Sequence, residues 1–337
     1  MPLSASPRIG FIGAGRLARC VARRLARAGY AVTAVASRSA ASAAALAELV
    51  DIDSAAREAQ ADARPAAPQT VRCAALDSPQ AVVDHAELIF LSVPDDVLAG
   101  IAASLRFAPD RAHGQALVHC SGASSLALLA PARTQRAATG SFHPLYLFGG
   151  GEADLTRIEG CSVTIEADGA LNDLLTAFAA ALGCHPLPFP QGQLTPDDRM
   201  LYHAAAHYAA SFTLSNLAEC VELWRTLGLA EDDALRALLP MLAGTLETAR
   251  DKGLANALSG PVSRGDAGVV ARQLARLASQ GGDHATFYAL HTRRALALAR
   301  QRTPSSVAPA SLDAIERAVT ASLAPERAAT RPADGEP

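Results

Sequence analysis

The 337-residue sequence lacks an excess of positive charge and a long apolar run. Its 30 Lys and Arg residues are balanced by 33 Asp and Glu residues, and no basic block stands out. Nucleic-acid binding depends on neutralising phosphates, so the composition argues against it. No apolar run approaches the length of a membrane span, and residues 1–6 lack the basic and apolar regions of a signal peptide. We therefore expect a cytoplasmic protein that acts on a small molecule.

The sequence also has few aromatic residues and no closely spaced cysteines. Aromatics make up 4% of the chain, and the six cysteines occur without C-x-x-C spacing. Scattered thiols fit a reduced protein better than a disulfide framework or a zinc cluster, so we expect no metal site. The apolar residues are rich in alanine, which favours closely packed helices, and the length is sufficient for two domains.

A glycine-rich turn near the N-terminus organises the chain. An apolar strand is predicted at residues 8–12, and a helix closed by Gly29 at residues 17–28. Between them, Gly13 can adopt dihedrals that other residues avoid, and Gly15 lets the backbone approach a pyrophosphate. Free amides at the helix N-terminus then face an anion. The predicted dinucleotide site comprises Gly13, Ala14, Gly15, Arg16 and Leu17. The alternative is an α/β domain whose turn binds nothing.

The end of the next predicted strand, residues 31–36, indicates the type of cofactor. An acidic side chain there would bind the ribose 2′-hydroxyl, whereas Ser37, Arg38 and Ser39 suit a 2′-phosphate. We therefore favour NADP and keep NAD as the alternative. The other interpretation is that Arg38 is a solvated loop arginine.

Further strands alternate with predicted helices, which is typical of a doubly wound parallel sheet of the Rossmann type. These strands are predicted at residues 71–75, 88–93, 116–119, 161–166 and 185–189. Ligands bind at the carboxyl ends of such strands, so Val93, Pro94 and Asp95 are expected at the cofactor crevice. Ser121 and Gly122 are expected beside them. Asp95 acting only as a helix cap is an equally good interpretation.

A complete helix start signal occurs at Thr195, followed by a proline and two acidic residues, and predicts one helix over residues 196–227. Arg199, His203 and His207 lie near one side of it. A cation beside an imidazole can bind a carboxylate and transfer a proton. The alternatives are a polar domain interface and a metal pair, for which no third ligand is evident.

One more histidine is a candidate. His143 precedes a proline, which favours an extended backbone at the cleft side of the sheet. It is either a catalytic group or a turn histidine that satisfies a backbone group.

The pattern divides the chain into a dinucleotide-binding domain over residues 1–190 and an all-helical substrate and dimerisation domain over residues 191–305. In the second domain a loop is predicted at residues 258–266, where Gly260 and Arg264 are candidate substrate contacts. A structural role for Arg264 is the alternative. Residues 51–70 are predicted as a surface insertion, and residues 306–337 as a short helix and a disordered tail.

Six short motifs occur in an order that resembles one known family. They are residues 13–18, 90–95, 119–123, 142–145, 202–206 and 259–266. They resemble the two-domain bacterial family that joins a Rossmann-like half to the domain of unknown function 2520. The resemblance implies kinship with pyrroline-5-carboxylate reductase, ketopantoate reductase, prephenate dehydrogenase and 3-hydroxyisobutyrate dehydrogenases. It also implies NAD or NADP as cofactor and a homodimer joined through the C-terminal helices, but no general substrate.

This chain departs from the family at two positions. Where the family usually has a lysine and an asparagine on the long helix, it has Arg199 and Ser211. The resemblance implies that those two residues contact the substrate carbonyl, so Arg199 and Ser211 are candidate substrate contacts. Arginine is too basic to release a proton, which shifts the catalytic role to His203, with His143 as second candidate.

We therefore hypothesise an NADP-dependent reductase or dehydrogenase. It would transfer hydride between nicotinamide and a small anionic keto, imino or hydroxy acid in an interdomain cleft. A catalytically silent NADP-binding sensor or scaffold is the alternative, favoured by the loss of the lysine and the asparagine. A deazaflavin-dependent reductase is the third hypothesis.

Overall fold

The computed structural model describes residues 3–60, 72–190, 192–303 and 307–324. The chain forms two compact units, Met1–Ser215 and Asn216–Pro337. The expected division into functional domains at residue 190 stays a prediction. The predicted tail beyond residue 324 lies outside the described residues, as do residues 61–70 of the predicted insertion.

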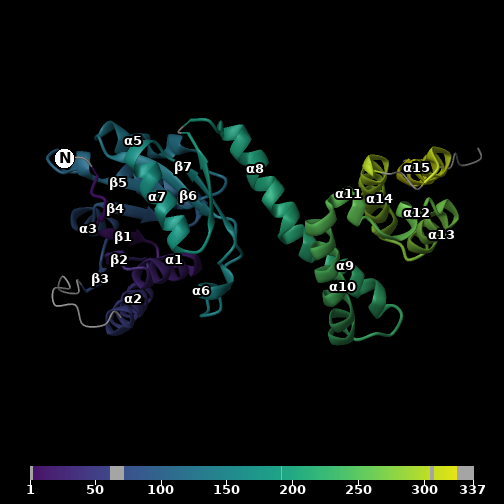
Figure 1. Cartoon of the computed structure of the whole chain (residues 1–337), viewed down its shortest axis with the longest axis horizontal. Helices are drawn as coiled ribbons and strands as arrows, with labels where there is room; N and C mark the ends of the chain where they lie inside the picture. Colours follow the sequence, from purple (N-terminus) through teal and green to yellow (C-terminus); the bar gives the residue numbers. More distant parts are fainter. Residues whose placement is uncertain (1–2, 61–71, 191, 304–306, 325–337) are drawn as a thin grey trace, which may run out of the picture. The chain divides into compact units, whose positions relative to one another are not determined.

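The N-terminal unit contains an eight-stranded sheet in the order β3-β2-β1-β4-β5-β6-β7-β8 (Figure 1). The strands are β1 (Ile9–Ile12), β2 (Val32–Ala36), β3 (Ala74–Leu76), β4 (Leu88–Leu91), β5 (Ala116–His119), β6 (Ala138–Pro144), β7 (Ser162–Glu166) and β8 (His185–Phe189). All neighbours are parallel except β6 and β7, which are antiparallel. The strand order reverses between β1 and β4, where such folds bind ligands. The expected Rossmann-type α/β fold with C-terminal helices is confirmed.

Successive side chains of the central strands enter different cores on the two faces of the sheet. Ile9 and Phe11 of β1 belong to one core and Ile12 to the other, because side chains alternate along a strand. The first face is covered by α1 (Arg16–Arg27), α2 (Ala40–Gln60), α6 (Asp154–Arg157) and α7 (Gly169–Ala181). The second is covered by α3 (Pro79–His85), α4 (Asp95–Ser104) and α5 (Ala130–Thr134). Both cores hold the carboxyl ends of β1, β4 and β5 in place.

The single long helix expected from residue 196 to 227 is wrong. The structure has α8 (Pro196–Ala209) and α9 (Ser211–Arg225), separated at Ala210 with φ −109° and ψ −80°. Thr213 Oγ1 donates to the carbonyls of Ala209 (3.0 Å) and Tyr208 (3.3 Å). Such hydroxyl-to-carbonyl bonds compete with the helix backbone and bend helices, and neither glycine nor proline marks the break in the sequence.

The C-terminal unit consists of helices. Besides the larger part of α9, they are α10 (Glu231–Lys252), α11 (Leu254–Ala257), α12 (Gly260–Arg264), α13 (Ala267–Ala278), α14 (His284–Gln301) and α15 (Pro309–Leu323). The expected loop at residues 258–266 is corrected, because a proline near the start and the left-handed Gly265 at the end enclose the short helix α12. For residues 51–60 the predicted insertion is corrected, since α2 continues to Gln60 through alanines and other helix formers. None of the described helices combines the length and the apolar composition that a membrane crossing needs.

Candidate functional site

β1 ends at the glycine turn, where Gly13 adopts φ +109°. A Cβ atom on Gly13 would lie 2.3 Å from the backbone oxygen of Ser92, which follows β4. Ser92 Oγ donates a hydrogen bond of 3.1 Å to the Gly13 carbonyl. The turn therefore approaches the end of β4 so closely that only glycine fits.

Gly15 is free of such contacts. Apart from adjacent backbone, no atom lies within 4 Å of the position that its Cβ would occupy. Gly15 is the N-cap of α1, and no side chain caps the first amides of this helix. Ala14 is buried beside it, Leu17 is half-buried and Arg16 is exposed. Open amides at a helix N-terminus, approached through a glycine, fit the pyrophosphate of a dinucleotide.

The end of β2 carries Ser37, Arg38 and Ser39. Arg38 is exposed and makes no ion pair within the described part of the chain. Ser39 Oγ accepts a hydrogen bond from the Ser42 amide (3.2 Å) at the start of α2. No acidic side chain occupies this position, so the residues present fit a 2′-phosphate better than a ribose 2′-hydroxyl.

The loops after β4 and β5 lie next along the sheet. Val93 is half-buried, and Pro94 and Asp95 are exposed at the first turn of α4. After β5, Ser121 Oγ accepts hydrogen bonds from the amides of Ala123 (3.2 Å) and Ser124 (2.9 Å), which fixes the loop around Gly122.

Gly122 connects this loop to two histidines. A Cβ atom on Gly122 would lie 2.6 Å from His143 Cε1 and 3.0 Å from His203 Cδ2. The absence of a side chain thus brings the backbone of the predicted cofactor crevice against both imidazoles. The structure therefore places His143 and His203 together, although 60 positions separate them.

α8 is attached to the β6–β7 ladder through Arg199. Ser141 lies opposite Glu166 in this ladder. Arg199 Nη2 donates to Ser141 Oγ (2.8 Å) and to the carboxylate of Glu166. Arg199 is 0% and Glu166 1% exposed, and Glu166 Oε1 also accepts from the Gly192 amide (2.9 Å). The expectation that Arg199 binds a substrate carboxylate stays a prediction, and the burial of its guanidinium against a carboxylate of the chain itself favours a structural role.

The second attachment uses Tyr202, one helical turn later. His143 lies opposite Thr164 in the ladder. The Tyr202 hydroxyl is hydrogen-bonded to His143 Nδ1 (3.0 Å) and to Thr164 Oγ1 (2.7 Å). Tyr202 thereby fixes the orientation of the His143 ring, whose Nε2 faces Gly122.

The pKa values of two histidines are strongly lowered. Burial, followed by the charges of His203 and Arg199, lowers the pKa of His143 to about 4, against an opposing effect of Asp95. Burial, followed by the charges of Arg199 and His143, lowers the pKa of His119, at the end of β5, to about 3. Both imidazoles are therefore neutral near pH 7.

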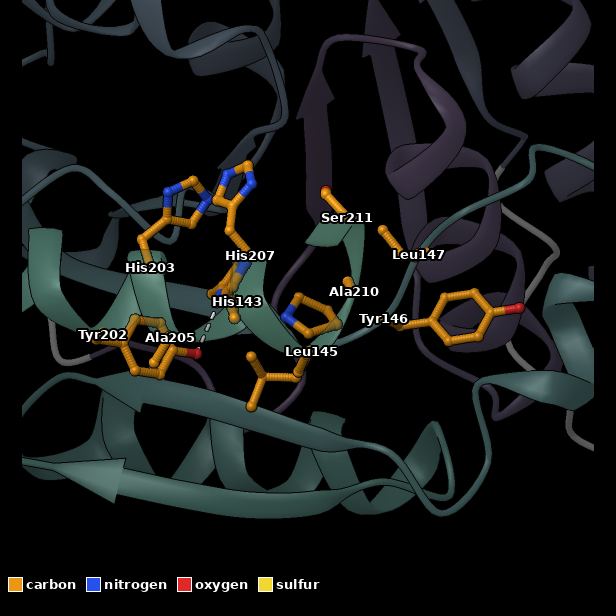
Figure 2. A pocket seen from close by; sticks show the side chains of 13 residues that line it. His143, Leu145, Tyr146, Leu147, Tyr202, His203, Ala205, His207, Ala210 and Ser211 are labelled. Carbon is orange, nitrogen blue, oxygen red and sulfur yellow. Dashed lines mark hydrogen bonds between the residues drawn. The ribbon is translucent and has the colours of Figure 1, made fainter. Parts of the chain in front are cut away.

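A cavity of about 690 Å³ lies between the end of β6 and α8 (Figure 2). Its walls include His143, His203 and His207, and the ring of His203 lies between the other two. The ring centroids of His143 and His203 are 6.5 Å apart, and those of His203 and His207 are 4.7 Å apart. The remaining wall is formed mainly by Leu145, two tyrosines and the alanines of α8. The described residues include no cluster of three or more His, Cys, Asp or Glu side chains that could hold a metal ion.

The other predicted substrate residues fall into two groups. Ser211 lines the cavity. Gly260, with φ +81°, and Arg264 belong to the C-terminal unit. Arg264 is exposed and forms an ion pair with Asp266 (2.9 Å).

Sequence reasoning missed four residues of the site. They are His119, Thr164, Glu166 and Tyr202. Tyr202 lies within a motif that carries the family resemblance, as does His119, but neither was assigned a role. Thr164 and Glu166 have no local signal, because their importance depends on the pairing of β6 with β7.

Two family models match the chain. Residues 8–122 match the family described as NADP oxidoreductase, coenzyme F420-dependent, and residues 161–295 match the domain of unknown function 2520. The resemblance expected from the motifs is confirmed. The matches support an NAD(P)-dependent oxidoreductase, and the NADP prediction is confirmed at the level of the family. A search of the curated proteins found no match.

Solved structures show the same fold. Protein TM1727 from Thermotoga maritima is 21% identical with a TM-score of 0.62, covering 87% of this chain and 98% of its own. An imine reductase from Pseudomonas sp. is 17% identical with a TM-score of 0.53, covering 94% and 93%. Pyrroline carboxylate reductase from Plasmodium falciparum, solved with NADP bound, is 11% identical with a TM-score of 0.50, covering 95% and 98%.

Proposed function

We propose that the chain binds NADP at the glycine turn and catalyses the reversible reduction of a small carbonyl or imine compound in the cavity beside α8. The observation that carries the proposal is the contact of Gly122 with both His143 and His203. It joins the crevice at the carboxyl ends of the strands to a cavity lined by imidazoles. When bound, NADP supplies or takes up the hydride.

The cofactor residues are those predicted from the strand ends. They are Gly13, Ala14, Gly15, Arg16, Leu17, Ser37, Arg38, Ser39, Val93, Pro94, Asp95, Ser121 and Gly122. The first group binds the pyrophosphate through backbone amides, and Arg38 with its two serines binds the 2′-phosphate. The loops after β4 and β5 hold the nicotinamide end.

His203 and His143 orient the reacting carbonyl or imine and transfer its proton. His143 is neutral near pH 7 because its pKa is lowered to about 4, so it acts as a hydrogen-bonding group rather than as a fixed cation. Tyr202 holds it in place. The anionic acid expected from the sequence depended on Arg199, whose contacts favour a structural role instead.

We also propose a homodimer. Large apolar side chains of α8 and of the first part of α9 are exposed, including Leu201 (72%), Tyr208 (70%) and Leu214 (61%). Exposed apolar patches on stable proteins usually bind a partner, and a second copy is the partner that the family resemblance implies. Light scattering of the dilute protein tests this, and a monomer would contradict it.

Calorimetric titration with NADPH tests cofactor binding, with Gly15→Ala compared with Gly100→Ala. Both glycines have open space around the missing Cβ, and Gly100 lies within α4. A methyl group at position 15 should keep the pyrophosphate away from the backbone, weakening binding about tenfold (~1.4 kcal/mol). Gly100→Ala should bind NADPH like the natural protein. Equal binding by both variants would contradict the placement.

Turnover is tested by following NADPH oxidation with a panel of ketones, keto acids and imines, with and without coenzyme F420. Oxidation by one compound class supports the proposed function. NADPH that binds but is never oxidised would favour the silent sensor or scaffold, and reduction of coenzyme F420 would favour the deazaflavin hypothesis.

A further inference from the structure

The cavity has no fixed charge on its walls. None of the described residues that line it is Arg, Lys, Asp or Glu. The titratable groups in its wall are three imidazoles and the hydroxyls of Tyr146 and Tyr202. A substrate carboxylate that entered this cavity would gain no ionic partner from these walls in return for the water that it displaces, which is unfavourable.

The arginine of α8 does not add a positive charge to the cavity wall. Arg199 is fully buried, does not line the cavity, and is paired with Glu166. The other fixed charge that acts on His143 is negative, since the carboxylate of Asp95 opposes the lowering of the His143 pKa. Arg199, Glu166 and Asp95 together carry one positive and two negative charges, a balance that disfavours an anion.

The hydrogen bonds of Tyr202 also suit a protonated nitrogen. The Tyr202 hydroxyl can donate to Thr164 Oγ1 while accepting from His143 Nδ1–H. In that arrangement His143 Nε2 is an acceptor. It can receive a hydrogen bond from an N–H group, and the ring of Tyr146 in the same wall can stabilise a delocalised cation.

We propose that the substrate is an imine without a carboxylate, bound in its protonated form, and that the product is the corresponding amine. This inference rests on the proposed function. When bound, NADPH would supply a hydride, with its electron pair, for a C–H bond at the C=N carbon. The π electrons of the C=N bond pass to nitrogen, leaving a neutral amine and NADP⁺. The proton that the histidines transfer in the proposed function is already on the imine nitrogen when the hydride arrives.

A matched pair of rings tests the inference. Methylpyrroline and pyrroline carboxylate share the same cyclic imine, and only the second carries a carboxylate. We expect kcat/KM for methylpyrroline to exceed that for pyrroline carboxylate by about tenfold or more. Calorimetry with the amine counterparts, methylpyrrolidine and proline, with and without NADP⁺, gives a readout that does not depend on turnover. Methylpyrrolidine should bind more tightly.

A wall substitution should reverse this preference. Ala209 is exposed and lines the cavity, whereas Ala103 is exposed on α4 and does not line it. Ala209→Arg should raise the affinity for proline and the turnover of pyrroline carboxylate about tenfold, because it adds a cation to the wall. Ala103→Arg should leave both unchanged.

Two failures can be told apart. If NADPH does not bind, the proposed function fails and this inference fails with it. If NADPH binds and pyrroline carboxylate or proline is preferred by the natural protein, only the inference is overturned. An equal response of Ala209→Arg and Ala103→Arg would also overturn it, because the cavity would then not contact the carboxylate.

Discussion

Replacing Arg199 by methionine should strongly destabilise the N-terminal unit. Arg199 is 0% and Glu166 1% exposed, so the substitution leaves a buried carboxylate without its cation. Removing one member of a buried ion pair costs roughly 3–5 kcal/mol, against a total of about 5–15 kcal/mol for a typical domain. With a urea m-value of about 3 kcal/mol/M, the unfolding midpoint should fall by about 1–2 M.

Three variants make the comparison specific. Glu166→Gln should destabilise the protein to a similar extent, because it leaves the guanidinium unpaired. The double variant Arg199→Met, Glu166→Leu should lose less than the sum of the two single losses, since it removes both charges. Arg236→Met serves as control. It breaks an exposed pair with Asp233 (side chains 75% and 58% exposed) and should leave the midpoint unchanged.

A different outcome would refute this reasoning. If Arg199→Met keeps the natural urea midpoint but loses affinity for a keto acid, the guanidinium serves the substrate and not the docking of α8. Additive single and double losses would likewise show that Arg199 and Glu166 do not act as a pair.

Three further predictions concern the turn, the tyrosine and acid stability. Gly13→Ala should destabilise the protein by at least ~1–2 kcal/mol in urea unfolding, because its Cβ would meet Ser92 at positive φ; unchanged stability would contradict the turn geometry. Tyr202→Phe should lower kcat about tenfold and shift the acid limb of its pH profile, with NADPH binding intact; a profile like that of the natural protein would remove Tyr202 from its positioning role. The free energy of unfolding should fall as pH drops from 6.5 toward 4. In the folded protein the pKa values of His119 and His143 are lowered from 6.5 to about 3 and about 4. The unfolded chain therefore binds protons at these two histidines at a higher pH than the folded chain does. His119→Gln should make this loss smaller in urea unfolding at pH 5, and an unchanged slope would count against the neutral buried imidazole.

Local patterns were sufficient for most of the fold. β5 and β8 lie at the predicted residues, because apolar runs between turn signals define strands well. The capping of α8 was also correct, with Thr195 and Asp198 forming the predicted start signal. The break at Ala210 was missed because it depends on hydroxyl-to-carbonyl bonds inside an otherwise regular helix, and not on glycine or proline.

The candidate site was only partly predictable, for a related reason. The helical spacing correctly places His203 and His207 on one side of α8, where both line the cavity. The same spacing suggested that Arg199 shares their role. Its actual partner, Glu166, lies 33 residues earlier in the sequence, and only the antiparallel pairing of β6 with β7 brings the two together. Periodicity gives the side of a helix but not what that side contacts.

The uncharged character of the cavity follows from this pairing. In the β6–β7 ladder, Ser141 faces Glu166 and His143 faces Thr164, two positions further along. The acidic end of this ladder segment therefore binds residue 199 of α8, and the neutral pair two positions further along binds residue 202, one helical turn later. Once the only arginine of α8 is bound by the acidic acceptor, the residues of the next turns that reach the cavity are Tyr202, alanines and imidazoles. The Arg199 guanidinium could reach the cavity only if α8 rotated and broke both attachments. The contacts of β6 and β7 with Arg199 and Tyr202 therefore determine which side chains of α8 line the cavity.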